Sequence, residues 1–242
     1  MRPMRSMGGG GFGFAGVESM AAKLAIGLVA GSVIALAAGA TRGGVGALLL
    51  LSPGGVLHNL WLWQPFTYAF VELNPLGIIF GALILYSIGG GLEMSWGSRR
   101  LLWVVWGGTV LAGFLTLLVG LVFPVNGVYT GGGVMTTLAW VAYGLSIGRG
   151  QANFWGIPIS GNVLAGIGAG FVFLNTLTAG VASQVPEIFA LIIAFAYVNG
   201  GSPRRVLLRV QHWRLQRQLR GRSRHLKVLS KEQDRPDDRY LN

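Results

Sequence analysis

The amino-acid sequence predicts an all-α integral membrane protein: a bundle of six transmembrane helices with an interfacial first loop and both termini in the cytoplasm. Hydrophobic residues make up 52% of the 242 residues and charged residues only 11%, against roughly 25% charged residues in a soluble domain. The mean hydropathy is +0.57. Several uncharged stretches are long enough for helices of ~20 residues, which cross about 30 Å of hydrocarbon. The lipid bilayer is therefore the first partner that the sequence predicts.

Six apolar runs define the predicted membrane domain, at residues 20–200. A flexible, glycine-rich cytoplasmic leader precedes it at residues 1–19, and a basic cytoplasmic tail follows it at residues 201–242. The first run is too long for the apolar region of a signal peptide, so we interpret it as a helix. Its Gly27 and Gly31 form a GxxxG pair, which allows close helix contact. The predicted spans are residues 20–40, 75–92, 101–122, 133–147, 154–177 and 186–198.

Residues 43–73 differ from the other apolar stretches because prolines and glycines interrupt them. Pro53 and Pro65 break the stretch, and Trp61 and Trp63 lie close together within it. Indole rings are enriched at the depth of the lipid headgroups. We therefore expect a long, partly helical loop that lies in the outer membrane interface.

The distribution of basic residues sets the predicted orientation. With the N-terminus inside and six spans, Arg42 alone falls on the outer side. Cytoplasmic loops of membrane proteins carry an excess of lysine and arginine. A count of five or seven spans would scatter the basic residues over both sides. Those on the cytoplasmic side before the tail are Arg2, Arg5, Lys23, Arg99, Arg100 and Arg149.

The tail interleaves arginines with apolar residues such as Trp213 and Leu219. A basic amphipathic helix beside a membrane is attracted to anionic lipid headgroups, which we expect to be its partner. Nucleic acid is the other common partner of basic segments. We do not expect it here, because basic tails beside membranes are common for topological reasons alone. The arginines concerned are Arg204, Arg205, Arg209, Arg214, Arg217 and Arg220.

Few residues of the chain are suited to catalysis. It contains no cysteine and three histidines, of which His58 alone precedes the tail. The three aspartates all follow residue 230, so no pair of aspartates can face each other within the bundle. The chain has no H-E-x-x-H motif for zinc and no glycine-rich phosphate loop with its lysine. We therefore expect neither a metal ion nor a cofactor.

Residues 63–70 read W-Q-P-F-T-Y-A-F, and residues 89–100 read G-G-G-L-E-M-S-W-G-S-R-R. These two stretches resemble motifs of the rhomboid family of intramembrane serine proteases. That family has a tryptophan–arginine pair and F-T-x-A-F in its first loop, and Tyr-x-Gly-Gly-x-x-Glu at the end of its second helix. The spacing from Phe66 to Glu93 matches this pattern without a gap. The chain departs from it at Gln64, in place of the arginine, and at Ser87, in place of the tyrosine. The matching residues are Trp63, Phe66, Thr67, Ala69, Phe70, Gly89, Gly90, Glu93, Gly97 and Arg100.

The same resemblance implies that the catalytic residues are missing. The serine of the family falls at Gly132, followed by the matching Gly133, and an alternative register places Thr130 at the nucleophile position. The histidine base of the family falls near Glu187. Because a serine or threonine nucleophile needs an adjacent base, we expect an inactive enzyme. The two oxyanion positions of the family fall at Gly77 and Gly81.

The resemblance also assigns structural roles. Glu93 corresponds to a glutamate that ties the first loop of rhomboids to the bundle by hydrogen bonds. Glycines at positions 77, 81 and 132 are expected to leave a roomier and less polar cavity than the one in an active protease.

These observations favour a rhomboid-like pseudoprotease that binds the transmembrane segments of client membrane proteins. Two other functions stay open. One is an active intramembrane serine-type endopeptidase with a non-standard nucleophile, Thr130. The other is a small membrane transporter that uses Glu72 and Glu187, which lie near the outer ends of their helices. Because no organellar transit segment is visible, we expect a bacterial inner membrane.

Overall fold

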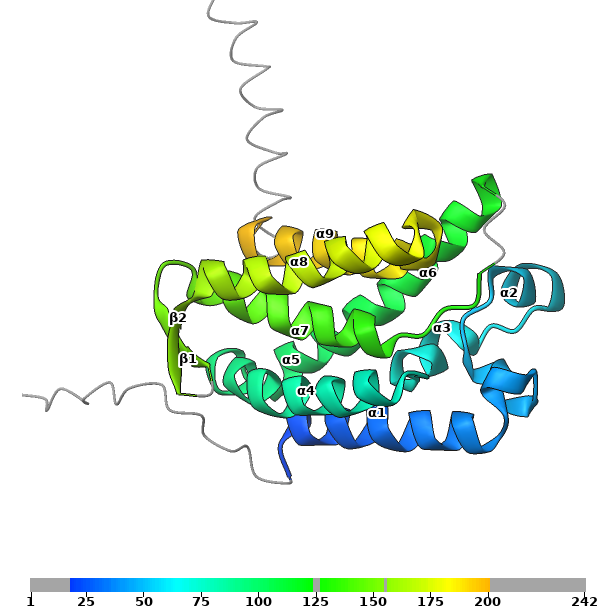
Figure 1. The fold of residues 1–242 in the computed structure, drawn as a ribbon, viewed down its shortest axis with the longest axis horizontal. Coiled ribbons are helices and arrows are strands. Elements are labelled where there is room, and N and C mark those ends of the chain that lie inside the picture. The colour runs from blue at the N-terminus through cyan, green and yellow to red at the C-terminus, as the bar shows by residue number, and fades with distance from the viewer. Residues whose placement is uncertain (1–17, 124–126, 155, 201–242) are drawn as a thin grey trace, which may run out of the picture. The chain divides into compact units, whose positions relative to one another are not determined.

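The computed structural model describes residues 18–123, 127–154 and 156–200, and helices dominate these segments (Figure 1). Most of the predicted leader and the arginines of the basic tail lie outside the described residues. The helical elements, with 3-10 or π segments marked η, are α1 (Met20–Ala37), η1 (Ala40–Arg42), η2 (Val45–Leu49), α2 (Pro53–Asn59), α3 (Gln64–Thr67), η3 (Tyr68–Phe70), α4 (Pro75–Trp96), α5 (Ser98–Leu102), the π-helix η4 (Trp103–Gly107), α6 (Gly108–Val122), α7 (Gly132–Ile147), α8 (Gly161–Ala179), η5 (Val181–Gln184) and α9 (Val185–Gly200).

By length and composition, five helical segments of the described part can cross a membrane. A further apolar helix, α7, has 16 residues. At 1.5 Å per residue this is roughly 24 Å, shorter than the ~30 Å hydrocarbon core. Met135, Leu138 and Ala139 of α7 are all 0% exposed, so protein surrounds much of this helix. The five long segments are Met20–Ala37, Pro75–Trp96, Ser98–Val122, Gly161–Ala179 and Val181–Gly200.

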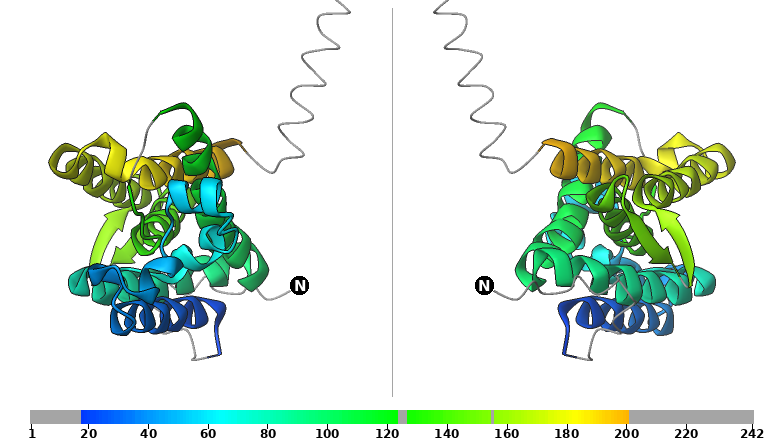
Figure 2. Two further views of the ribbon diagram at one scale, coloured as in Figure 1. Left: turned by 90° about the vertical axis from the view of Figure 1, so that its right-hand side faces the viewer. Right: turned by 90° about the vertical axis from the view of Figure 1, so that its left-hand side faces the viewer.

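Helix α7 is central to the packing of the bundle. It lies between α4 and α8, and α1 packs on α4 (Figures 1 and 2). A Cβ atom at Gly144 would lie 2.5 Å from the backbone nitrogen of Ala165, so only glycine lets α7 approach α8 this closely. In a membrane, where lipid tails are as apolar as leucine, such close backbone packing is a main source of helix association.

Helix starts follow from short-range sequence signals. Ser19 caps α1 by accepting a hydrogen bond from the Ala22 amide at 3.1 Å. Asn74 caps α4 by accepting from the Leu76 amide at 3.0 Å, and Pro75 fills the first helical position. Such side-chain caps satisfy amides that have no partner within the helix.

The first loop is partly helical, as the sequence predicts. It contains η2, α2, α3 and η3 between α1 and α4. The GxxxG pair of α1 packs against its end, because Cβ atoms at Gly27 and Gly31 would each lie 3.0 Å from the side chain of Phe70. The predicted close contact is thus between a helix and a loop of the same chain.

The predicted fifth span is wrong at its start. Gln151–Phe154 and Ile157–Ser160 form strands β1 and β2, an antiparallel hairpin that precedes α8. The turn contains Gly156, whose φ of 88° suits glycine. The hairpin is apolar enough to resemble the start of a membrane helix, so hydropathy alone could not separate the two.

The first, second, third and sixth predicted spans coincide with helical segments that are long and apolar enough to cross a membrane, with shifted ends. Helix α7 covers the predicted fourth span but is shorter than these segments, so the count of six spans stays a prediction. Helix α1 ends at Ala37, and α4 continues to Trp96, four residues beyond the predicted end. The third span begins at Ser98 and includes the π-helix. Helix α9 begins at Val185, one residue before the predicted start.

Candidate functional site

The positions that the family resemblance singles out come together where α4, α7 and α9 begin. A Cβ atom at Gly77 of α4 or at Gly132 of α7 would contact the same side chain, that of Glu72. A Cβ atom at Gly133 would contact Glu187 of α9. Residues more than 100 positions apart in the sequence therefore share one small region.

Glu72 fills the space that two of these glycines leave. Its Cγ and Cδ lie 2.9 Å and 3.0 Å from the position of a Cβ at Gly77. Its Cβ and Oε2 lie 2.7 Å and 3.1 Å from the position of a Cβ at Gly132. The side chain thus lies between the first turns of α4 and α7.

Glu187 reaches the same region from α9. Its Oε1 is the atom nearest to the position of a Cβ at Gly133, and Oε2 of Glu72 lies 3.9 Å from that position. The two carboxyl groups are therefore within about 6 Å of each other. Among the described residues, no hydrogen-bond donor reaches the Glu187 carboxyl group. The structure therefore brings together Glu72 and Glu187, the two residues that the transporter hypothesis requires to be close.

A set of short hydrogen bonds orients Glu72. Its Oε1 accepts from the backbone amides of Leu73 and Asn74 at 3.0 Å and 3.1 Å. Its own amide donates to Oγ of Ser32 at 2.9 Å, and that hydroxyl donates to the Leu28 carbonyl at 2.6 Å. The carboxyl group therefore lies beside the start of α4, where the helix dipole favours negative charge.

The predicted roomier cavity is wrong. Glu72 fills the space beside Gly77 and Gly132, as described above. A Cβ atom at Gly81 would lie 2.9 Å from Cδ2 of Leu28 and 3.1 Å from Oγ1 of Thr136. The space that the three glycines leave is therefore filled by other side chains, mainly Glu72 of the first loop and Leu28 of α1. The only sequence signal for this filling is the position of Glu72, a large loop residue five positions before Gly77 of α4.

The backbone amides at the start of α7 are already engaged. The Gly131 amide donates to the carbonyls of Tyr68 and Val71 at 2.9 Å and 3.1 Å, and the Gly132 amide donates to Val71 at 3.1 Å. Acyl-transfer enzymes need donors that are free to bind the developing oxyanion. These two amides instead hold the first loop against α7.

The alternative catalytic groups do not form a nucleophile–base pair. In the described part of the chain, no hydrogen bond joins Thr130 to Glu187. His58 lies in α2, where its Nδ1 is 3.1 Å from the Gly54 carbonyl oxygen at an exposed position. Beside Thr130, the buried Tyr129 donates its hydroxyl to the Ala182 carbonyl at 2.7 Å, and burial raises the pKa of this tyrosine.

The motif residues of the first loop hold the loop together. Nε1 of Trp63 donates to the Leu48 carbonyl at 3.1 Å, and Oγ1 of Thr67 donates to the Leu49 carbonyl at 3.1 Å. Phe66 packs edge-on against Phe114 of α6, with ring centroids 5.9 Å apart. These contacts account for the matching residues without a catalytic role.

At the other end of α4, Gly89 and Glu93 contact α1. A Cβ atom at Gly89 would lie 3.4 Å from Cβ of Ala21, and Gly90 is buried beside it. The predicted role of Glu93 in tying the first loop to the bundle is wrong. Its carboxylate accepts from the amides of Met20 and Ala21 at 3.0 Å and 2.9 Å, and from the Ser98 hydroxyl. Glu93 is at the far end of α4 from the loop, so it joins the starts of α1 and α5 instead.

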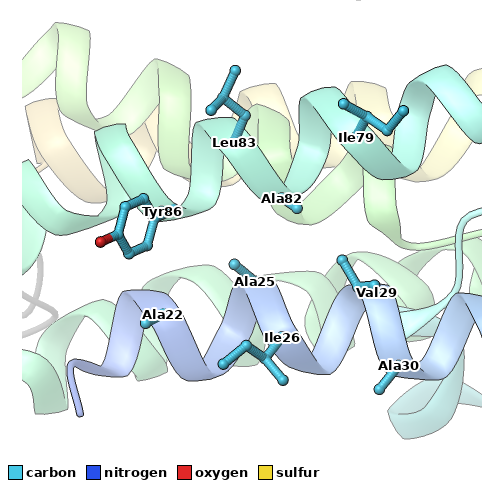
Figure 3. Close-up of a pocket in the computed structure, with 9 residues that line it drawn as sticks. All are labelled: Ala22, Ala25, Ile26, Val29, Ala30, Ile79, Ala82, Leu83 and Tyr86. Carbon is cyan, nitrogen blue, oxygen red and sulfur yellow. The ribbon is translucent and has the colours of Figure 1, made fainter. Parts of the chain in front are cut away.

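A lateral groove of about 610 Å³ runs between α1 and α4 (Figure 3). Its lining is apolar apart from the hydroxyl of Tyr86. Ala22 and Ala25 are buried beneath it, whereas Ile26 and Ile79 are 55% and 62% exposed. The lining residues are Ala22, Ala25, Ile26, Val29, Ala30, Ile79, Ala82, Leu83 and Tyr86.

Comparison with known proteins identifies the family of the chain. Residues 22–148, just over half of the 242, match the family model described as "Eukaryotic integral membrane protein (DUF1751)". No curated protein matches the chain. The predicted bacterial inner membrane is wrong, because the matched family is described as eukaryotic. The lack of a visible transit segment was a weak basis for that prediction.

Proposed function

Because the chain belongs to this family of eukaryotic integral membrane proteins, within the broad rhomboid-like clan, we propose that it binds transmembrane segments of client membrane proteins without cleaving them. One observation carries this proposal: Glu72 and Glu187 fill the space beside Gly77, Gly132 and Gly133, to which the resemblance assigns the catalytic groups of a rhomboid protease. The engaged amides of Gly131 and Gly132 support it further. A membrane bundle can bind a transmembrane helix without a nucleophile and a base, so the proposed function needs no catalytic group.

The groove between α1 and α4 is the proposed client surface. The small side chains of Ala22 and Ala25 at its base would let the backbone of another helix approach closely. The exposed side chains of Ile26 and Ile79 would pack against the sides of that helix. Helix association in membranes relies on such small residues, because apolar burial gives little gain in lipid. Both flanking helices are long and apolar enough to cross the membrane, so the groove would face the lipid.

The proposed topology places six crossings in the bilayer, with α7 as the short central one. Both termini would lie in the cytoplasm and the first loop in the outer interface. The Glu72–Glu187 pair would then lie near the outer surface, and Glu93 near the inner one. Protease protection of tags placed before α1 and after α9 would test this orientation.

A photo-crosslinking experiment tests the client surface. A crosslinking amino acid is placed at Leu83 in the groove or at Ile167 on α8, which are 40% and 39% exposed. We expect crosslinks to intact membrane proteins from position 83, and fewer from position 167. A second variant, Ala82→Trp, fills the groove and should abolish the crosslinks. Equal crosslinking from both positions, unaffected by the tryptophan, would refute the proposed surface.

Proton-coupled transport is the second candidate function, because the structure brings Glu72 and Glu187 within about 6 Å. Carboxyl groups inside a membrane domain are costly and often mark ion or proton pathways. Uptake of a substrate into vesicles that is lost in Glu187→Gln would favour transport. Glu93→Gln, which alters a carboxyl group at the other end of α4, is the matched control.

A further inference from the structure

Three exposed basic residues gather at the end of the bundle where α1 and α5 begin. Lys23 lies in the first turns of α1, and Arg99 and Arg100 follow Ser98 at the start of α5. Glu93 holds these two helix starts together, because its carboxylate accepts hydrogen bonds from both. Lys23 is also close enough to interact electrostatically with Glu93. We call Lys23, Arg99 and Arg100 the basic patch.

The positive charge of the basic patch is only partly compensated. Glu93 already accepts three hydrogen bonds, and the other described carboxylate at this end is the exposed Glu18. Arg149, just beyond α7, adds a fourth cation at this end of the bundle. At the opposite end of the bundle the described acidic residues outnumber the basic ones, since Glu72 and Glu187 accompany Arg42.

Aromatic residues place the basic patch at the depth of lipid headgroups. Trp96, at the end of α4, packs on Tyr197 of α9, with ring centroids 5.5 Å apart. Trp103, one turn beyond the arginines, is 70% exposed. Tryptophan and tyrosine are enriched at membrane–water interfaces, and basic residues next to them meet the phosphates of the nearer leaflet. At this depth the lipid headgroups surround the patch, so an acidic protein is a less accessible partner than the lipid.

We propose that the basic patch binds the phosphate groups of anionic lipid headgroups. The residues that carry the site are Lys23, Arg99 and Arg100, and Glu93 positions them. This site lies in the membrane domain and is separate from the basic tail. It does not depend on the proposed binding of clients.

Spin-labelled lipids test the proposal on the full chain in phosphatidylcholine vesicles. The measured quantity is the association of spin-labelled phosphatidylserine relative to spin-labelled phosphatidylcholine. We expect a preference for phosphatidylserine that falls about fivefold for each neutralised residue, because this ratio corresponds to roughly 1 kcal/mol per basic residue. The variants are Lys23→Gln, Arg99→Gln and Arg100→Gln, singly and together. Arg42→Gln, a neutralised arginine at the opposite end, is the matched control and should leave the preference unchanged.

Three results would overturn the proposal. One is a triple variant that keeps the wild-type preference while its helical content and thermal midpoint are also unchanged. Another is an equal loss of preference in Arg42→Gln. The third is displacement of the lipid by millimolar soluble glycerophosphate, which would assign the site to free phosphates. A preference that is lost in the triple variant, weakened by salt and resistant to glycerophosphate would support the lipid site.

Discussion

Replacing Gly132 by serine would introduce the residue type that the proposed resemblance to rhomboids places there, and we expect it to destabilise the protein without creating activity. The new Cβ would lie 2.7 Å from Cβ of Glu72 and 2.9 Å from Cδ1 of Leu28. Neither neighbour can turn away freely: Glu72 is held by its bonds to the start of α4, and Leu28 is 0% exposed. Overpacking of this kind costs about 1–3 kcal/mol.

The assay for Gly132→Ser is the free energy of unfolding, from titration with a denaturing detergent in mixed micelles. Gly166→Ser on α8 is the matched control, because a Cβ there would meet no atom within 4 Å apart from the local backbone of its own helix. We expect the control to stay within about 0.5 kcal/mol of wild type. Adding Glu72→Gly should restore part of the stability of Gly132→Ser, because it removes one of the two clashing groups. If Gly132→Ser is as stable as the control, Glu72 does not fill the nucleophile position.

Three further predictions follow from single contacts. Gly77→Ala should cost about 1–3 kcal/mol of unfolding free energy, and Glu72→Ala should relieve it, because the Cγ and Cδ atoms that clash are removed; additive costs in a double-mutant cycle would contradict this. Glu93→Ala should cost about 1–3 kcal/mol of unfolding free energy, because it leaves two amides at the start of α1 unpaired. The thermal midpoint should therefore fall, and an unchanged midpoint would contradict the proposed role of Glu93 in joining α1 to α5. Gly31→Ala should lower the midpoint because its Cβ would collide with the backbone carbonyl oxygen of Phe70; Gly54→Ala, with open space around it, is the control and should not.

Sequence patterns predict the membrane helices well because their signal is local. Apolar runs with few charged residues mark each long span, and asparagine followed by proline marks the start of α4. The hairpin before α8 was missed because hydropathy does not distinguish an apolar strand from the first turn of an apolar helix. Gly156 and Pro158 were the available signals, since proline is tolerated in strands that lie at a sheet edge.

The sequence predicts where the candidate site lies, but not which side chains fill it. The resemblance placed Gly77, Gly132 and Glu187 in one region, and the structure brings them together. It could not show that Glu72 fills that region, because the direction of a loop side chain depends on contacts such as the one with Ser32 of α1. Complementary changes of size between distant residues are invisible in a single sequence.

The role of Glu93 was missed for the same reason. Its position in the motif was correct, but its partners are the start of α1 and Ser98. Whether a carboxylate at a helix end binds a loop or a neighbouring helix is decided by tertiary packing.

The central claim is that the protein binds transmembrane helices at the α1–α4 groove and does not cut them. The most direct measurement reconstitutes the purified protein in liposomes with a labelled model rhomboid substrate, and an active rhomboid in parallel. Energy transfer between a donor at position 83 and the substrate reports binding, and the mass of the recovered substrate reports cleavage. We predict energy transfer that Ala82→Trp abolishes, and an intact substrate where the active rhomboid cuts it. Cleavage that disappears in Thr130→Ala, or energy transfer that the tryptophan leaves unchanged, would contradict the claim.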